Sequence, residues 1–174
     1  MHLDFETERL WMRPTLPQDA ELIYALMNTP KFLQYVGDRN IRSVADAESY
    51  IKAKMLPQLD KLGYSSYTLI TKVEAVKIGT CGLYDREGVD GIDIGFGFLP
   101  AYEGMGYGYE AASRLLTAAF EDFKIQEVKA ITSKENIASQ KLLEKLGLVL
   151  EGTTLLPNED EEILLYRKVC QLRT

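Results

Sequence analysis

The sequence predicts a mixed α/β fold in which about seven strands are flanked by helices. Alternating apolar and polar residues separated by short turn-forming stretches fill residues 66–99, which is typical of strands. Apolar residues at helical spacing lie before and after this region. After residue 90 the order is strand, glycine-rich loop, helix and strand, so the helix is expected to cross over and pack against the sheet. No repeat or linker divides the 174 residues, and we expect a single domain over residues 1–174.

The N-terminal part is expected to begin with one strand and continue mainly as helices. The patterns predict a strand at 8–13, a helix that opens at Thr15 or Pro17, and a helical region at 44–62. Prolines punctuate these elements, because proline lacks the N–H that ladders and helix interiors require. Pro14 is expected to end the strand, Pro30 to end the first helix, and Pro57 to interrupt the second helical region.

The rest of the chain alternates strands with two amphipathic helices. The patterns predict strands at 66–73, 77–85 and 91–99, a helix at 108–123, a strand at 128–132, a helix at 137–146 closed by Gly147, and strands at 149–155 and 163–169. The first three strands are close in sequence and are expected to form a meander.

Composition excludes several classes of function. Cys81 and Cys170 are far apart and lack the spacing of a zinc site or a disulfide framework, so both are expected to be buried thiols and no metal is predicted. The only histidine is His2, which removes Ser-His-Asp, Cys-His and His-ligated metal chemistry. The formal net charge of -6 argues against nucleic acid as a partner and suits an amine-bearing substrate.

No apolar run is long enough to span a membrane and the start lacks a signal pattern, so a cytoplasmic protein is expected. A monomer or a homodimer is expected.

A glycine-rich segment predicts an anion-binding loop. Glu103-Gly-Met-Gly-Tyr-Gly108 lies between an apolar strand and an amphipathic helix, where glycines leave backbone N–H groups unobstructed beside a helix N-terminus. The alternative is a flexible turn. The spacing differs from the dinucleotide pattern, because Tyr109 occupies the place of its third glycine, and no phosphate-binding Gly-x-x-x-x-Gly-Lys-Ser/Thr motif occurs. Coenzyme A is the diphosphate ligand that remains.

Several motifs together resemble the GNAT acetyltransferases, over nearly the whole chain. They are Thr7-Glu-Arg-Leu-Trp-Met-Arg-Pro14 with Asp19, Ile92-Asp-Ile-Gly-Phe-Gly-Phe-Leu-Pro100, the glycine loop ending Tyr109-Glu-Ala111, and Asn136-Ile-Ala-Ser139 before Leu146-Gly-Leu148. They are most similar to the branch that acetylates ribosomal-protein N-termini on alanine or serine. The resemblance implies a GNAT-like, mostly antiparallel sheet and acetyl-coenzyme A as the acetyl donor. Glu103 departs from the family pattern, which has Arg or Gln at this position.

The resemblance also assigns residues to the cofactor. It implies that Phe98 and Leu99 offer main-chain groups to the pantetheine arm, and that an N–H near Leu99 polarises the thioester carbonyl. The other cofactor-binding residues implied are Gly104, Met105, Gly106, Tyr107, Gly108, Tyr109 and Asn136. Asn136 is equally suited to cap the following helix. Arg114 can approach the cofactor phosphates or pair with Glu110 one helical turn away.

Two catalytic residues are expected. Ser139 matches a serine thought to reach the coenzyme A sulfur in this family, although it can also be an ordinary residue of a first helical turn. Many family members use a tyrosine seven residues beyond the matching asparagine, where this chain has Leu143. Asp93 is the leading general base, because the resemblance places its strand at the active cleft. The alternative is an exposed strand residue, and Glu74, Asp85 and Glu87 stay open as bases.

These observations predict direct transfer of an acetyl group from acetyl-coenzyme A to a primary amine, with protein N-terminal amines favoured. A small-molecule amine such as a polyamine, amino sugar or antibiotic is an alternative acceptor. A non-catalytic acyl-coenzyme A sensor or scaffold is a rival of another class, and a nucleotide-binding oxidoreductase is a third, which lacks the required glycine spacing. Cys81 has no histidine to activate it, so no covalent intermediate is expected.

Overall fold

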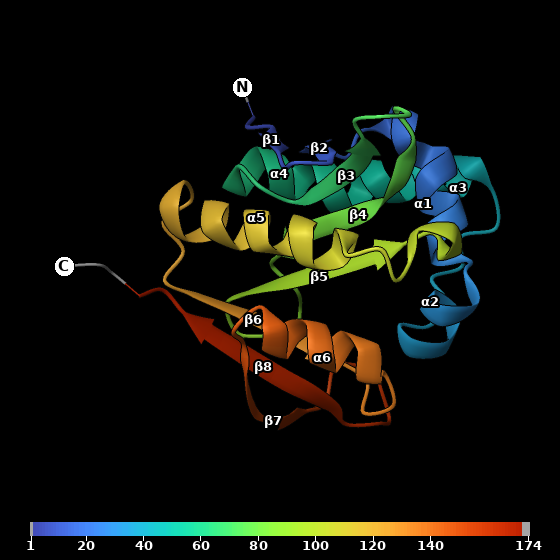
Figure 1. Ribbon diagram of the computed structural model, residues 1–174. Coiled ribbons are helices and arrows are strands. Elements are labelled where there is room, and N and C mark those ends of the chain that lie inside the picture. The colour runs from blue at the N-terminus through green and yellow to red at the C-terminus, as the bar shows by residue number, and fades with distance from the viewer. Residues whose placement is uncertain (1, 172–174) are drawn as a thin grey trace.

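A central sheet of eight strands organises residues 2–171, which are the residues that the computed structural model describes (Figure 1). The strands are β1 (Phe5–Glu6), β2 (Leu10–Pro14), β3 (Ser66–Thr71), β4 (Lys77–Tyr84), β5 (Ile92–Phe98), β6 (Glu127–Thr132), β7 (Val149–Thr154) and β8 (Ile163–Val169). Their order is β1-β2-β3-β4-β5-β6-β8-β7, and only β5 and β6 pair in parallel. The predicted mixed, mostly antiparallel fold is confirmed. The additional strand is β1, whose two residues are too short to show alternation.

Helices cover both faces of this sheet. They are α1 (Ala20–Met27) with the short helix η1 (Pro17–Asp19) before it, α2 (Pro30–Tyr35), α3 (Val44–Tyr50), η2 (Ile51–Met55), α4 (Leu56–Leu62), η3 (Pro100–Tyr102), α5 (Tyr107–Glu121) and α6 (Ile137–Lys145). In Figure 1, α5 and α6 lie in front of the sheet, and α3 and α4 lie behind it. Among the described residues, none of the helices combines the length and the apolar character that crossing a membrane requires.

The main core lies between the sheet and α5. Four alanines of α5, Ala111, Ala112, Ala118 and Ala119, are buried and join a cluster of strand side chains. Small side chains allow the helix axis to approach the sheet closely, and Leu115 and Leu116 then fill the space between them. A second, smaller cluster joins α1, α3 and η2 on the other face.

Proline shapes two helical segments in ways that the sequence indicates only in part. Residues 44–62 are helical throughout, but the turns of η2 are widened to a π-helix immediately before Pro57. Pro57 cannot donate to the carbonyl of Ala53 and its ring crowds that group, so a locally widened helix accommodates it. Pro30 begins α2 instead of only ending α1, with Thr29 as its N-cap, because the first helical position needs no N–H donor. The prediction missed α2 for this reason.

A buried ion pair fixes the connection from β2 to α1. The carboxylate of Asp19, with no exposed surface, accepts hydrogen bonds from both terminal nitrogens of Arg13, at 2.7 and 2.8 Å. It also accepts from the N–H of Leu16 at 2.9 Å and lies 2.7 Å from the ammonium group of Lys77. Burial alone would raise the pKa of Asp19, but these partners lower it well below its ordinary value. The beginning of α1 is therefore tied to β2 and β4.

Candidate active site

The two edges of β5 differ in how far they are paired. Toward β4, six residue pairs join the strands, from Tyr84 opposite Asp93 to Gly79 opposite Phe98. Toward β6 only two pairs form, Ile92 with Val128 and Asp93 with Lys129. Both strands continue past this point, so within the described residues the later part of β5 has no strand partner on its β6 side. A parallel sheet interrupted in this way offers a crevice at the carboxyl ends of its strands, where ligands bind in open α/β sheets.

The backbone groups on this open edge belong to Phe96 and Phe98. The N–H of Leu99 donates to the carbonyl of Ile78 on β4 at 2.9 Å. Antiparallel partners alternate between bonded and non-bonded pairs, so Gly97 also directs its backbone groups to β4, whereas Phe96 and Phe98 direct theirs toward the gap. An extended chain such as a pantetheine arm can pair with a strand edge of this kind.

Both backbone groups of Leu99, one of the residues expected to contact the pantetheine arm, are bonded within the protein. Its N–H is bonded to β4, and its carbonyl accepts from the N–H of Tyr102 at 2.9 Å in η3. Its side chain packs against the cluster formed by α1 and α3. The polarising donor expected near Leu99 is therefore not its own N–H, and the free groups of Phe98 and Phe96 precede it on the strand.

The glycine loop has the shape of an anion cradle. Gly104 and Gly106 adopt left-handed φ values of 72° and 83°, and Gly106 is the N-cap of α5. Such φ values strain any residue with a Cβ. At Gly108 an added Cβ would lie 3.0 Å from the side chain of Leu142 and 3.5 Å from that of Phe98. The N–H groups of the first α5 turn, at Tyr107, Gly108 and Tyr109, have no partner within the helix. A diphosphate fits this loop, since small residues give it access to several N–H groups at a helix N-terminus.

Arg9 and Glu110 hold the loop in place, although sequence reasoning gave Arg9 no role. The guanidinium of Arg9 bonds to the Glu110 carboxylate at 2.7 Å and donates to the carbonyl of Met105 at 2.9 Å. The same carboxylate accepts from the Arg9 N–H at 3.0 Å and from the hydroxyl of Thr7. The guanidinium also lies 4.1 Å from the centre of the Tyr107 ring. The start of β2 is thereby tied to the loop and to the first turn of α5.

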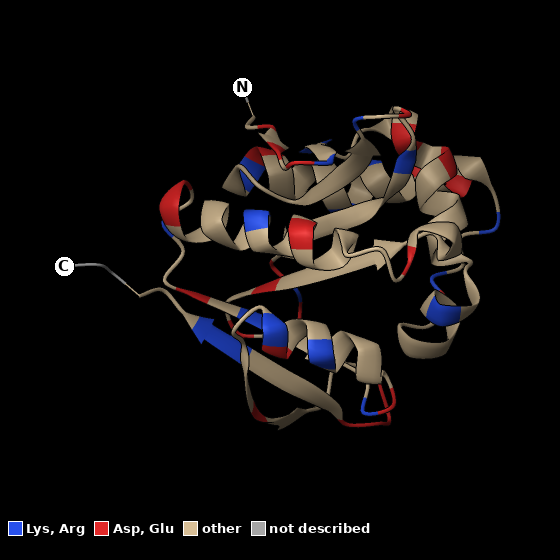
Figure 2. Cartoon of the chain, viewed as in Figure 1, with Lys and Arg blue, Asp and Glu red and all other residues tan. Residues whose placement is uncertain are grey.

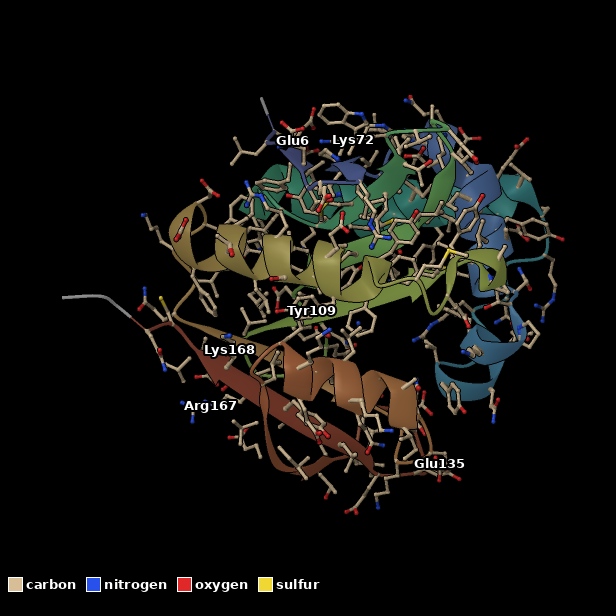
Figure 3. The ribbon with its side chains drawn as sticks, in the orientation of Figure 1. Glu6, Lys72, Tyr109, Glu135, Arg167 and Lys168 are labelled. Carbon is tan, nitrogen blue, oxygen red and sulfur yellow. The ribbon has the colours of Figure 1, made fainter. Side chains whose placement is uncertain are left out.

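This arrangement overturns the suggested pairing of Arg114 with Glu110. Glu110 is engaged by Arg9 and Thr7, and Arg114 lies over the ring of Phe5 with its guanidinium carbon 4.8 Å from the ring centre. Arg9, Glu110 and Arg114 line a shallow surface cavity of about 550 Å³ over α5. Tyr109 also lines it, on the side of α5 that faces α6 in Figure 3, with the ammonium group of Lys145 4.3 Å from its ring centre.

Asn136 and Ser139 lie just beyond the carboxyl end of β6, the strand parallel to β5. Asn136 is the N-cap of α6, and its side-chain oxygen accepts from the N–H of Ser139 at 3.3 Å. Since β5 and β6 are parallel, their carboxyl ends lie at the same end of the sheet, and the loops that follow them open on the same crevice. Both side chains are half-buried. Leu143 is buried in the core, at the position where many family members have a tyrosine.

Asp93 is buried, and the alternative of an exposed strand residue is wrong. It is 1% exposed and lies where pairing between β5 and β6 ends. Its side chain is on the face of β5 opposite the α5 core, together with Gly95 and Gly97. Arg86 approaches it, with Nε 3.2 Å from Oδ2. Burial raises the pKa of the Asp93 carboxyl above its ordinary value, and the positive charge of Arg86 opposes that rise.

Other chemistries find little support at this site. Cys81 is buried, and burial raises the pKa of its thiol to about 12, so a reactive thiolate is not available there. Within residues 2–171, the acidic, histidine and cysteine side chains do not gather in threes around a point where a metal ion would be held. Lysine and arginine are distributed over several elements in the view of Figure 2, and acidic residues lie among them.

Comparison with known proteins agrees with this geometry. Residues 9–149 match the family model described as the acetyltransferase (GNAT) domain. A relative from Bacillus subtilis (strain 168), the uncharacterized N-acetyltransferase YoaA, is 28% identical over 148 residues, which are 84% of this chain and 83% of that protein.

Solved structures share the fold. The ribosomal-protein-S5-alanine acetyltransferase from Vibrio fischeri superposes with a TM-score of 0.79 at 21% identity, covering 96% of each chain. RimL, a ribosomal L7/L12 alpha-N-protein acetyltransferase in complex with coenzyme A, gives a TM-score of 0.75 at 13% identity, covering 96% of this chain and 98% of that one. Members of the matched family use acetyl-coenzyme A. The family match covers most of the chain, and the protein therefore belongs to the GNAT family of N-acetyltransferases.

Proposed function

We propose that this N-acetyltransferase moves an acetyl group from acetyl-coenzyme A directly to a primary amine, and that its acceptor is a protein N-terminal amine. The observation that carries the donor half of the proposal is the open edge of β5 leading into the glycine loop. The N–H groups of residues 104–109 would bind the diphosphate, and Phe98 and Phe96 would pair with the pantetheine arm. When bound, the donor supplies an activated thioester.

The residues around the crevice support direct attack. The N–H of Phe96 or Phe98 would stabilise the negative charge that develops on the thioester carbonyl oxygen. The buried carboxylate of Asp93 would accept the proton of the attacking amine, directly or through water, since its environment raises the pKa of this group. Ser139, in the first turn of α6, would donate a hydrogen bond to the departing thiolate, which would take its proton from solvent.

The choice of a protein N-terminal amine as acceptor is supported by the structural neighbours and by the shape of one face of β5. Two of the structural neighbours have names that describe acetylation of ribosomal-protein chains, but their similarity to this chain is one of fold. On the face of β5 that carries Asp93, the ring of Tyr84 lies close to Gly95, whereas an added Cβ at Gly97 would meet open space. This would leave room for a chain terminus between the sheet and the helices behind it.

A two-stage experiment tests the proposal. Isothermal titration measures binding of acetyl-coenzyme A, with NADH as the control ligand, and a thiol-release assay then compares peptides that begin with alanine or serine with polyamines, amino sugars and aminoglycosides. We expect acetyl-coenzyme A to bind at micromolar concentration or tighter, NADH not to bind, and peptides to give the highest kcat/KM. A preference for a small amine contradicts the acceptor, binding without turnover indicates a sensor, and absence of binding overturns the donor assignment.

A further inference from the structure

An ion pair joins α2 to the first residue of the glycine loop. The ammonium group of Lys31 lies 2.6 Å from Oε2 of Glu103, although the two residues are 72 positions apart in the sequence. The Lys31 side chain is 61% exposed and that of Glu103 is 29% exposed, so the ammonium keeps access to solvent and to a ligand. In Figure 1, α2 lies next to the connection between β5 and α5 that contains this loop.

Glu103 creates an electrostatic problem for the proposed diphosphate site. Its carboxylate immediately precedes Gly104, where the N–H groups that would hold the diphosphate begin. A carboxylate next to an anion-binding loop repels the anion unless a nearby cation compensates the negative charge. Arg9 does not compensate Glu103, because the charge of its guanidinium is already paired with the carboxylate of Glu110.

We propose that Lys31 is the cation of the diphosphate site. An ammonium group has three hydrogens, and the bond to Glu103 uses one of them. Lys31 would keep that bond, cancel the charge of Glu103 and donate a second hydrogen bond to a phosphate oxygen of the donor.

This role also connects donor binding to the acceptor side of the protein. Phe32, the next residue of α2, packs against the cluster formed by α1, α3 and η2. A diphosphate bonded to Lys31 would therefore fix α2 between the glycine loop and these helices. The inference rests on the proposed donor, and its test separates the two claims.

The test is a titration of acetyl-coenzyme A into wild type, Lys31→Met, Glu103→Gln and the double variant. We expect Lys31→Met to weaken binding about tenfold, because it removes a charged hydrogen bond and leaves Glu103 uncompensated. Glu103→Gln removes the repulsive charge and leaves Lys31 free to bond the phosphates, so its Kd should equal the wild-type value or be roughly threefold tighter. Adding Glu103→Gln to Lys31→Met should recover part of the loss.

Lys52→Met is the matched control. Lys52 forms an exposed pair with Glu48 at 2.8 Å inside one helical region, with exposed fractions of 58% and 45%, and its loss should leave the Kd unchanged. If Lys31→Met also leaves it unchanged, or if Glu103→Gln weakens binding as much as Lys31→Met does, the pair has only a structural role and the inference is wrong. If wild type does not bind acetyl-coenzyme A, the proposed function itself fails. Hydrogen exchange in α2 gives a second readout: acetyl-coenzyme A should slow it in wild type but not in Lys31→Met.

Discussion

The β4 and β6 edges of β5 perform different tasks. The edge toward β4 is paired from Asp93 to Phe98, with six residue pairs, whereas the edge toward β6 is paired only at Ile92 and Asp93. The paired edge fixes the strand in the fold, and on the unpaired edge the backbone groups of Phe96 and Phe98 have no strand partner and could bond to the proposed donor. A strand can therefore present main-chain groups in a fixed geometry without a loss of stability, provided that its opposite edge is complete.

The largest effect is expected where the open edge enters the glycine loop. Gly106→Val forces a β-branched residue to a φ of 83° at the N-cap of α5, and its side chain would crowd Arg9. At least two charge-assisted bonds to the diphosphate would be lost, so acetyl-coenzyme A should bind about 100-fold more weakly by isothermal titration. Gly63→Val is the control, because Gly63 has a φ of 86° in open space at the end of α4. It should lower Tm to a similar degree but leave the Kd unchanged, and an equal loss of affinity in both variants contradicts the role of the loop.

The next effect concerns the point where pairing with β6 ends. Asp93→Asn should lower kcat by about 100-fold with little change in donor affinity, as expected for loss of a general base. Wild-type kcat should fall at acidic pH as Asp93 becomes protonated. Arg86 stabilises the carboxylate, so Arg86→Gln raises the pKa of Asp93 further and should move this decline to higher pH. A pH profile of kcat that does not change in Arg86→Gln would remove Asp93 from the mechanism.

A comparison of Arg9, which precedes β2, with Arg13, which lies in β2, separates effects on donor binding from effects on the stability of the fold. Arg9→Met releases the glycine loop from Glu110 and Met105, and should weaken binding of acetyl-coenzyme A about tenfold. Arg13→Met leaves a buried carboxylate at Asp19 without its main partner, and should lower the free energy of unfolding by about 3 kcal/mol without changing the Kd of the folded protein. Titration and chemical denaturation of both variants check this, and a reversed pattern would contradict the assignment.

Denaturation by acid should show how much the buried carboxylate of Asp19 contributes to stability. The pKa of Asp19 is lowered in the folded protein, so the stability that this carboxylate provides is complete above its ordinary pKa and is lost as the pH falls below it. Denaturation of wild type between pH 5 and pH 2 should follow this loss, given that carboxyl groups titrate near pH 4 when unperturbed. Asp19→Asn should be less stable at neutral pH and less sensitive to acid in this range.

The smallest effect concerns Asn136, whose capping and proposed cofactor contact use different atoms. Asn136→Ala should cost about 1 kcal/mol of stability through loss of the α6 cap. Asn136→Asp retains the capping oxygen and removes the NH₂ donor, so stability should be preserved while acetyl-coenzyme A binds about fivefold more weakly. If both the stability and the affinity of Asn136→Asp match wild type, Asn136 is a cap alone.

Local pattern was sufficient to predict most of the fold and the loop. The alternation of β5, the glycines at 104, 106 and 108, and the apolar face of α5 are signals within about 30 residues of sequence, and their order predicts the crossover. The two misses in the N-terminal part are also local: β1 has too few residues to show a period, and Pro30 has the same residue type whether it ends one helix or begins the next.

The features that the sequence did not reveal depend on register or on distant pairs. The register between β5 and β4 decides whether Leu99 or Phe98 directs its N–H to the open edge. The order of apolar and polar residues in the sequence does not say which of the two backbone directions applies. The contact of Arg9 with Glu110 spans 101 positions, and that of Lys31 with Glu103 spans 72. The burial of Asp93 could not be predicted either, since alternation alone places it on the opposite face from Ile94 but does not say that Arg86 lies against it there.

Amide hydrogen exchange by NMR tests the central claim most directly, because it reports on each edge of β5 separately. Without ligand, the N–H groups of Gly97 and Leu99 should exchange slowly, and those of Phe96 and Phe98 should exchange quickly. Saturating acetyl-coenzyme A should slow exchange at Phe96 and Phe98 and leave Gly97 and Leu99 as they were. Binding of acetyl-coenzyme A with no change at Phe96 and Phe98 would show that the donor lies elsewhere, and would contradict the account of the open edge.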